Sequence, residues 1–333
     1  MATMYYDKDV NKDVLKGKKI AIIGYGAQGR AQSLNLRDSG FDVIVAQRKG
    51  GKNYDKAIAD GWKPVSAKEA AEQADIIHIL VQDTLQSDLY KNDILPSMKK
   101  GKVLSFSHGF NVHFMQIVPQ ADIDVMLVAP KGPGDLVRSQ FQEGAGVPAI
   151  FAIFQNASGK AKEIALAFAY GVGGTRAGVL ETTFKEETET DLFGEQAVLC
   201  GGATALVKAG FETLVAAGYQ PEIAYFECFH ELKLIVDLMF KRGIAGMRDV
   251  ISNTAEWGDL ISGPRVINEE SRYQMELILE EIQNGEFASR WIAENKAGGC
   301  ASYHAKRNRD KLHQIEIVGA ELRSMMPFIQ EQK

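Results

Sequence analysis

A glycine-rich turn at residues 24–29 constrains the fold of this chain more than any other feature of its sequence. The segment 18–23, which is apolar from Ile20 onward, precedes the turn and predicts a buried strand. The segment 30–36 that follows the turn has the pattern of a helix. Glycines in this spacing permit a tight turn and a close approach of the backbone to a pyrophosphate, which the N-terminus of the helix attracts. The sequence therefore predicts a dinucleotide-binding turn, made of Gly24, Tyr25, Gly26, Ala27, Gln28 and Gly29.

Further apolar runs alternate with helical patterns along the first half of the chain. We expect strands at residues 42–46, 74–81, 102–106, 124–129 and 149–154. Strands that alternate with helices indicate a Rossmann-type, doubly wound parallel sheet, in which ligands bind beyond the carboxyl ends of the strands. Four polar residues follow predicted strands and are therefore candidate site residues: Arg48, Asp83, His108 and Lys131. His78 lies inside a predicted strand, and we interpret it as a packing histidine.

The loop after the second strand bears on the choice of cofactor. NAD-specific domains usually carry an acidic residue there, which binds the ribose 2′-hydroxyl. Residues 47–53 contain no acid and three cations, Arg48, Lys49 and Lys52. The forked guanidinium of Arg48 suits a 2′-phosphate and favours NADPH over NADH. The alternative interpretation is a solvated basic loop without such a contact.

After residue 183 the alternation stops and the pattern becomes helical. We expect helices near residues 190–217, 222–242, 267–283, 286–296 and 308–325, with glycine-rich joints at 201–202, 243–246 and 298–299. The sequence therefore predicts two domains. The first, at residues 1–182, binds the dinucleotide, and the second, at residues 183–328, is all-α.

Two acidic pairs at helical spacing lie in the second half. Asp191 and Glu195 are four residues apart, as are Glu227 and Glu231, so each pair shares one helix face. Apolar residues surround the second pair, and we expect it on a mostly buried helix. Buried carboxylates need a cation, and these pairs favour a hard divalent metal ion held by oxygens. We interpret three neighbouring acids instead as a solvated first helical turn: Glu186, Glu187 and Glu189.

Charge and composition argue against several classes of protein. A formal net charge of −5 disfavours a nucleic-acid-binding protein. No apolar run reaches transmembrane length, and the polar start of the chain does not resemble a signal peptide. Three widely spaced cysteines, Cys200, Cys228 and Cys300, form neither a disulfide framework nor a zinc site. They are typical of small buried side chains in a reducing cytoplasm.

Six longer motifs resemble those of one enzyme family. They are GYGAQGRAQ, FSHGFNVHF, VAPKGPGDLVRSQF, DLFGEQAVLCGG, YFECFHELKLIVDLMF and GIAGMRDVISNTAEWGD. From about residue 5 to residue 328 the chain resembles ketol-acid reductoisomerase (acetohydroxy-acid isomeroreductase) of the short type, with a single helical domain. Such enzymes convert 2-acetolactate to 2,3-dihydroxyisovalerate, and 2-aceto-2-hydroxybutyrate to 2,3-dihydroxy-3-methylvalerate, in the biosynthesis of valine, leucine and isoleucine. The resemblance implies NADPH and two Mg²⁺ ions as cofactors.

The resemblance also implies how the metal site is assembled. Asp191 and Glu195 would be metal ligands from one subunit, with Asp191 the candidate for a bridging position. Glu227 and Glu231 would come from the partner subunit. The helical domain of the family is knotted and forms intertwined dimers, so the resemblance implies a homodimer with shared active sites.

Contacts with substrate and cofactor follow from the same resemblance. Ser252 matches the serine that contacts the substrate. His108 and Lys131 match catalytic positions for proton delivery and charge stabilisation, and Glu231, or a hydroxide on the metal, would relay the proton at the migrating centre. Beyond the glycine-rich turn, the matching cofactor positions are Arg48, Gly51, Asn53, Asp83, Thr84, Leu85, Gln86, His108 and Gly134.

Some positions depart from the family pattern. Serine is common at three positions where this chain has Ala27, Gly51 and Asn53. Because serines at positions 51 and 53 usually contact the 2′-phosphate, their absence leaves NADH or dual use open. Arg30 and Asp135 replace the usual histidines. The sequence also leaves two other classes of function open, a hydroxy-acid dehydrogenase without metal and a dimeric NADPH-sensing binding protein.

Overall fold

The structure, a computed structural model, describes residues 3–326. Contacts divide the chain into two compact units, Met1–Thr190 and Asp191–Lys333. The division falls within one helix, α9 (Phe184–Phe193). The predicted end of the helical domain at residue 328 lies outside the described residues.

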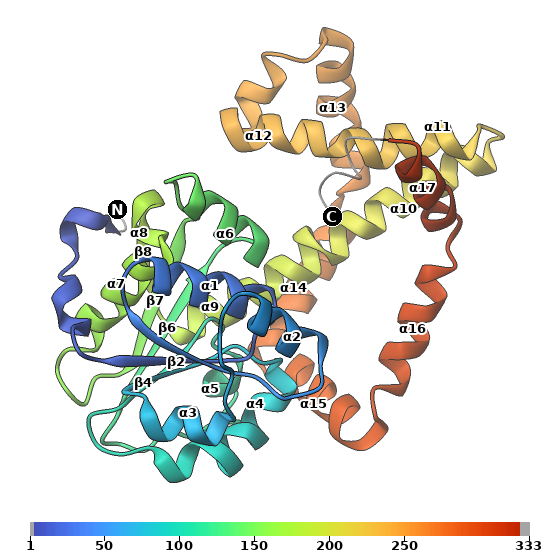
Figure 1. The fold of residues 1–333 in the computed structure, drawn as a ribbon. Coiled ribbons are helices and arrows are strands. Elements are labelled where there is room, and N and C mark those ends of the chain that lie inside the picture. The colour runs from blue at the N-terminus through green and yellow to red at the C-terminus, as the bar shows by residue number, and fades with distance from the viewer. Residues whose placement is uncertain (1–2, 327–333) are drawn as a thin grey trace. The chain divides into compact units, whose positions relative to one another are not determined.

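An eight-stranded sheet forms the centre of the first unit (Figure 1), in the order β1-β8-β7-β6-β5-β4-β2-β3. Its parallel part consists of β2 (Lys19–Ile23), β3 (Asp42–Ala46), β4 (Ile76–Ile79), β5 (Val103–Phe106) and β6 (Asp124–Pro130). β2 lies between β3 and β4, so the strand order reverses there as in a doubly wound sheet. This part of the fold confirms the prediction from the sequence.

The far edge of the sheet differs from the prediction of a wholly parallel sheet. β7 (Ala149–Gln155) pairs antiparallel with β6, and β8 (Val179–Thr182) then pairs parallel with β7. The N-terminal strand β1 (Met4–Tyr5) closes this edge antiparallel to β8. The sequence pattern reveals neither β1, which has only two residues, nor β8, in which Glu181 and Thr182 interrupt the apolar run.

Alternate residues of the buried strands face two separate cores. Ile20 and Ile22 of β2 contribute to one core, which includes Leu36 of α1 (Ala27–Asp38) and residues of α7 (Ala161–Val172). Ala21 and Ile23 contribute to the other core, which residues of α3 (Ala67–Gln73) cover. Helices therefore lie on both faces of the sheet (Figure 1), as a parallel sheet with two buried faces requires.

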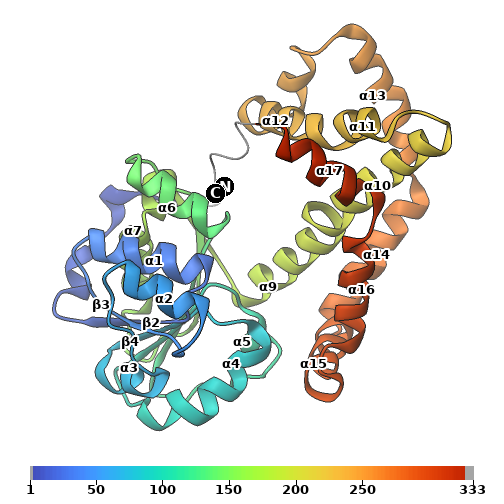
Figure 2. The ribbon, with the colours of Figure 1, turned by 45° about the vertical axis from the view of Figure 1, so that its right-hand side comes forward.

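The second unit is helical throughout its described part. Its helices after α9 are α10 (Gly201–Ala216), α11 (Pro221–Tyr225), α12 (Glu231–Arg248), α13 (Asn253–Val266), α14 (Glu269–Gln283), α15 (Glu286–Gly298), α16 (Ala301–Lys311) and α17 (Gln314–Ser324). A small core joins α10, α11 and α17 (Figure 2) through Phe211, Tyr225 and Ile315. Here too the helical class predicted from the sequence is confirmed.

Several helix boundaries in this unit differ from the prediction. The chain does not break at residues 201–202, because a π-helical turn, η5 (Gly194–Leu199), leads directly into α10. The predicted helix at 308–325 is two helices separated near Leu312, and α13 is not predicted at all. The joints at Gly243 and Gly299 are confirmed, since both have left-handed φ angles, 73° and 55°.

Many apolar side chains of the second unit are exposed in the single chain. Phe240 is 90% exposed, Leu199 71% and Trp257 65%. Glu227 and Glu231 are exposed as well. The prediction of a mostly buried helix around these two carboxylates is therefore wrong for the described part of one chain, because residues 3–326 do not cover the apolar faces of α12 and its neighbours.

One helical run also contradicts the expectation that no segment reaches transmembrane length. The run Phe184–Ala216 has 33 residues and, by length and composition only, is long and apolar enough to cross a membrane. A single helix of this kind is weak evidence for a membrane protein. The same run carries Asp191 and Glu195, charged groups that are costly at the centre of a bilayer.

Candidate functional site

A cavity of about 990 Å³ lies at the carboxyl ends of β2, β3 and β4. This is the point where the strand order reverses, and ligands of doubly wound sheets bind there. The predicted cofactor residues that line the cavity are Gly24, Tyr25, Gly26, Arg48, Asn53 and Leu85. Its size is at the upper end of the range for small-molecule sites and fits an extended dinucleotide.

Close backbone contacts explain three glycines around this cavity. Gly24 has a φ of +105°, and a Cβ there would lie 2.9 Å from the carbonyl of Leu80. A Cβ on Gly29 would lie 2.0 Å from the carbonyl oxygen of Gly24, and one on Gly134 would lie 2.3 Å from the carbonyl carbon of Ala27. Only glycine allows α1 to pack on the end of β2 and allows α6 (Gly134–Gln142) to approach the start of α1.

The other predicted cofactor positions do not line the cavity. They are Ala27, Gln28, Gly29, Gly51, Asp83, Thr84, Gln86, His108 and Gly134. Two of them support its surroundings through side-chain hydrogen bonds. Gln28 donates from Nε2 to the carbonyl of Gly132 at 2.8 Å, and Gln86 donates to the carbonyl of Val81 at 2.9 Å. Their direct contact with a cofactor stays a prediction.

A cluster of polar groups surrounds Glu187 on α9. The side chain of Glu187 is fully buried, accepts a hydrogen bond from the N–H of Gly109 at 2.8 Å, and lies 3.3 Å from Nζ of Lys131. His108, Glu187 and Asp191 each offer one ligand atom, and these atoms lie within 4.8 Å of one another. Since α9 is one continuous helix, Glu187 and Asp191 stand one turn apart on it. The structure thus brings three predicted site residues, His108, Lys131 and Asp191, to one buried carboxylate.

This cluster corrects the interpretation of the acids at the start of α9. Glu186 is exposed as expected, but Glu187 is only 1% exposed and Glu189 only 7%. The carboxylate of Glu189 lies 3.3 Å from Nε2 of His113. The sequence carried a signal for Glu187, because it precedes Asp191 by the same four residues that separate Asp191 from Glu195.

The remaining predicted metal ligands lie on or beside π-helical turns. Glu195 belongs to η5, Glu227 to η6 (Phe226–His230), and Glu231 begins α12 directly afterwards. Such turns are rare and are frequent at functional sites. A Cβ on Gly201 would lie 2.1 Å from a backbone carbonyl oxygen of η5, so glycine permits the return to α10. Within residues 3–326 these three acids join no group of potential ligands, and their role stays a prediction.

Ser252 stands at the start of α13. Its hydroxyl accepts a hydrogen bond from the N–H of Ala255 at 3.2 Å, which makes it the N-cap of that helix. A capping serine has a fixed position, because its side chain closes the first helical turn. Its proposed contact with substrate stays a prediction.

The buried histidine in β4 is a packing residue, as predicted. His78 is fully buried, with Nδ1 2.8 Å from the hydroxyl of Ser105 and Nε2 3.1 Å from that of Ser107. Ser107 donates to the carbonyl of Val128 and accepts from Gln32, so Nε2–H donates to Ser107 and Nδ1 accepts from Ser105. Burial lowers the pKa of His78 to about 3, which keeps the ring neutral.

The reversal of strand order, the glycine-rich turn and the cavity define a dinucleotide-binding domain, which a helical unit follows. Residues 14–178 match the family model of the acetohydroxy acid isomeroreductase NADPH-binding domain, and residues 184–328 match that of the ketol-acid reductoisomerase C-terminal domain. The chain belongs to the ketol-acid reductoisomerase family. Its reaction is the rearrangement and NAD(P)H-dependent reduction of a 2-hydroxy-3-keto acid, in branched-chain amino-acid biosynthesis.

Solved structures agree with this assignment. The chain is similar to an NADH-preferring ketol-acid reductoisomerase from an uncultured archean, with 48% identity, 98% of this chain and 99% of that chain covered, and a TM-score of 0.94. A semialdehyde dehydrogenase NAD-binding protein from Cupriavidus necator has a TM-score of 0.61 at 17% identity, over 80% of this chain and 99% of that one. That second similarity concerns the fold alone. Neither a metal-free hydroxy-acid dehydrogenase nor a binding protein accounts for both family matches.

Proposed function

We propose that this chain converts 2-acetolactate to 2,3-dihydroxyisovalerate, and 2-aceto-2-hydroxybutyrate to 2,3-dihydroxy-3-methylvalerate, with two Mg²⁺ ions and NAD(P)H. The observation that carries the proposal is the close group of His108, Glu187 and Asp191 beside Lys131. Carboxylate oxygens are the ligands that Mg²⁺ prefers. The dinucleotide cavity on the same unit as Lys131 supports a reduction as one half of the reaction.

Four carboxylates hold the metal ions in this proposal, from Asp191, Glu195, Glu227 and Glu231. Support comes from α9, where Asp191 already shares a ligand group with buried Glu187, and where Glu195 follows one turn later. When bound, Mg²⁺ would supply Lewis-acid stabilisation of the negative charge that develops on the substrate oxygens during alkyl migration.

The chain's own residues hold and move protons around the substrate. Glu187 fixes the ammonium group of Lys131, which stabilises negative charge on a substrate oxygen. His108 delivers a proton as the 2-keto group accepts hydride, and Glu231 relays the proton of the substrate hydroxyl in the migration step. The hydroxyl of Ser252 orients the substrate.

Both nicotinamide cofactors serve in this proposal, with a weak preference between them. Arg48 lines the cavity and supplies a charged fork for a 2′-phosphate. Gly51 and Asn53 offer fewer hydrogen bonds to a 2′-phosphate than two serine hydroxyls would. The acids Glu69 and Asp88 line the same cavity and disfavour the additional negative charge of that phosphate. The related archaeal enzyme is NADH-preferring.

The test is the consumption of NADH and of NADPH with 2-acetolactate, with Mg²⁺ and with excess EDTA. We expect oxidation of both cofactors that depends on Mg²⁺ and yields 2,3-dihydroxyisovalerate. Full turnover in excess EDTA would overturn the metal assignment. Oxidation of the cofactor without a shift of the alkyl group in the product would identify a simple reductase instead.

We further propose a homodimer with shared active sites and a knotted helical domain. The support is the number of large exposed apolar side chains on the second unit, among them Leu199, Phe240 and Trp257. Exposed apolar surface of this extent marks an interface. The proposed partner is a second copy of the chain, and each copy would supply Glu227 and Glu231 to the site of the other.

Complementation tests the shared site. Asp191→Ala and Glu227→Ala should each inactivate the enzyme. After unfolding and refolding together, about half of the dimers are mixed, and each carries one intact site, so about a quarter of the wild-type activity should return. Mixed dimers without activity would show that one chain supplies all four carboxylates.

Two smaller expectations complete the proposal. The proposed domain boundary lies between residues 182 and 183, and it is supported by family matches that end at residue 178 and begin at residue 184. The protein acts in the cytoplasm, where its free cysteines Cys200, Cys228 and Cys300 stay reduced. Limited proteolysis and cell fractionation test these two statements.

A further inference from the structure

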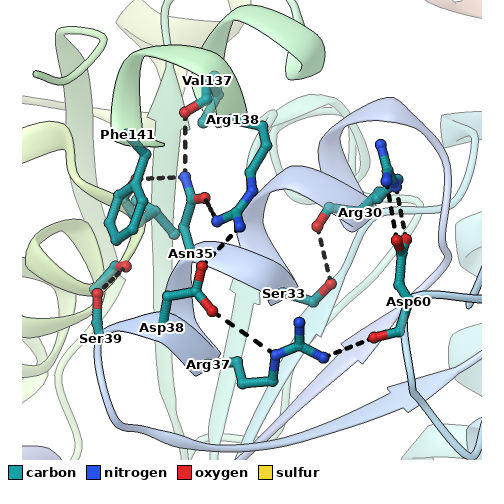
Figure 3. Close-up of polar contacts among 12 residues, drawn as sticks. Arg30, Ser33, Asn35, Arg37, Asp38, Ser39, Asp60, Val137, Arg138 and Phe141 are labelled. Atoms are coloured by element: carbon teal, nitrogen blue, oxygen red, sulfur yellow. Dashed lines mark hydrogen bonds and ion pairs between the residues drawn. The ribbon is translucent and has the colours of Figure 1, made fainter. Parts of the chain in front are cut away.

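A group of side chains behind the dinucleotide cavity connects α1 to the end of α2 (Lys52–Ala59). Asp60, which follows α2, receives a forked ion pair from Arg30 of α1, with Nε to Oδ2 at 2.6 Å and Nη2 to Oδ1 at 2.9 Å (Figure 3). The backbone carbonyl of Asp60 also accepts a hydrogen bond from Arg37 at 2.8 Å. Two guanidinium groups of one helix thus hold the same residue.

Tyr25 connects this group of side chains to the wall of the cavity. Its hydroxyl donates to Oδ2 of Asp60 at 2.9 Å and accepts from Nε1 of Trp62 at 2.8 Å. The ring is 1% exposed and packs with Val45 and Ala57, so the side chain points away from the cavity. Its backbone N–H donates to Oε1 of Gln47 at 2.8 Å, which ties the glycine-rich turn to the loop after β3.

The charges in this group reinforce one another. The hydrogen bond from Arg30 holds the pKa of Asp60 below its usual value, and the same contact raises the pKa of Arg30. Burial, together with Asp60, raises the pKa of the Tyr25 phenol. The phenol therefore stays a donor to a carboxylate that stays ionised, and the connection persists across the working pH range.

We infer that Arg30, Asp60 and Tyr25 are positioning residues that hold the two walls of the dinucleotide cavity at a fixed separation. One wall is the glycine-rich turn, and the other is the loop of residues 47–53, which runs directly into α2. Neither Arg30 nor Asp60 lines the cavity, so any effect on the cofactor passes through the backbone of these walls. The affinity for the adenosine half of the dinucleotide then depends on an ion pair outside the site.

Asp60→Asn is the main test, because it keeps the shape of the side chain and removes its charge. We expect the Kd for NADH and for NADPH, measured by direct fluorescence titration, to rise by about 3- to 30-fold, the range for residues that act through a network. The kcat at saturating cofactor and the KM for 2-acetolactate should stay within a factor of about two. Because titration needs no turnover, it remains informative if the proposed reaction is wrong.

Asp38→Asn is the matched control. Asp38 stands at the other end of α1 and pairs with Arg138 of α6 at 2.7 Å (Figure 3), so its loss removes a similar ion pair from the same helix. Both variants should unfold at somewhat lower urea concentration than the wild type, but only Asp60→Asn should weaken the binding of the cofactor. Equal Kd values for Asp60→Asn and Asp38→Asn would overturn the inference and leave Asp60 a purely stabilising residue.

A double-mutant cycle gives a second, independent criterion. If Arg30 acts through Asp60, then Arg30→Gln combined with Asp60→Asn should raise the Kd no further than Asp60→Asn alone. Arg30→Lys, which keeps the charge but loses the fork, should give an intermediate Kd. Additive effects of the two substitutions on the cofactor Kd would contradict the inference even where Asp60→Asn folds poorly.

Discussion

Acid should destabilise the first unit through one buried histidine. His78 is fully buried in β4, and burial lowers its pKa from 6.5 to about 3. In the unfolded chain the same imidazole binds a proton below about pH 6.5. Between these two pH values the unfolded state holds more protons than the folded state, so the free energy of unfolding falls as the pH falls.

The size of the effect follows from the width of this window. Each pH unit within it costs about 1.36 kcal/mol. The loss is therefore about 2.7 kcal/mol at pH 4.5 and approaches a limit of about 4.8 kcal/mol below pH 3. Above pH 6.5 the histidine causes no loss of stability. The free energy of unfolding of a domain is about 5–15 kcal/mol. Protonation of this one side chain in the unfolded state therefore removes a large share of that free energy by pH 4.5.

Urea unfolding between pH 7.5 and pH 4.5 measures the effect, with Trp62 as the fluorescent probe in a background of Trp257→Phe and Trp291→Phe. The difference in unfolding free energy between the wild type and His78→Gln should shrink by about 2.7 kcal/mol over this range. His304→Gln, which changes an exposed histidine of α16, is the control and should leave the profile unchanged. Parallel profiles for the wild type and His78→Gln would refute the reasoning.

Three further changes test the proposed sites. Arg48→Ala should raise the KM for NADPH far more than that for NADH, because it removes a charged contact with the 2′-phosphate worth about 1.5–3 kcal/mol; equal effects in steady-state kinetics would exclude that contact. Glu187→Gln should lower kcat by about 10²-fold, because Lys131 loses the carboxylate that places it, and an unchanged kcat would contradict this role. Gly201→Ala should weaken Mg²⁺ binding in calorimetric titration, since its Cβ would meet a backbone oxygen, whereas Gly258→Ala has open space and should bind normally.

The sequence predicts the first unit well where local patterns decide the structure. The turn at Gly24 and the five parallel strands follow from periodicity and from glycines that no other residue can replace. The antiparallel direction of β7 could not be predicted, because its apolar run of six residues indicates a strand but not the direction of that strand. Pairing of β1 with β8 joins residues about 175 positions apart, as in Met4 and Leu180, and no local signal encodes it.

The candidate site shows the same division between local and long-range information. Residue type and position after a strand are enough to single out Arg48, His108 and Lys131. The burial of Glu187 depends on Gly109 and Lys131, which reach it from distant parts of the chain. The link between Arg30 and Asp60 is likewise invisible in the sequence, since an arginine thirty residues before an aspartate carries no signal of contact.

In the second unit, the described residues of one chain do not bury all the apolar side chains that the pattern predicts to be buried. In the first unit each apolar strand face finds a helix of the same chain, and the pattern predicts burial correctly. In the second unit the pattern is equally strong, yet Leu199 and Phe240 remain in solvent. The exposure of apolar side chains of this size to water costs free energy. Their pattern therefore indicates that they contact the surface of another molecule. Glu227 and Glu231 lie within the same apolar stretch, and the proposed metal site and the proposed dimer therefore depend on each other.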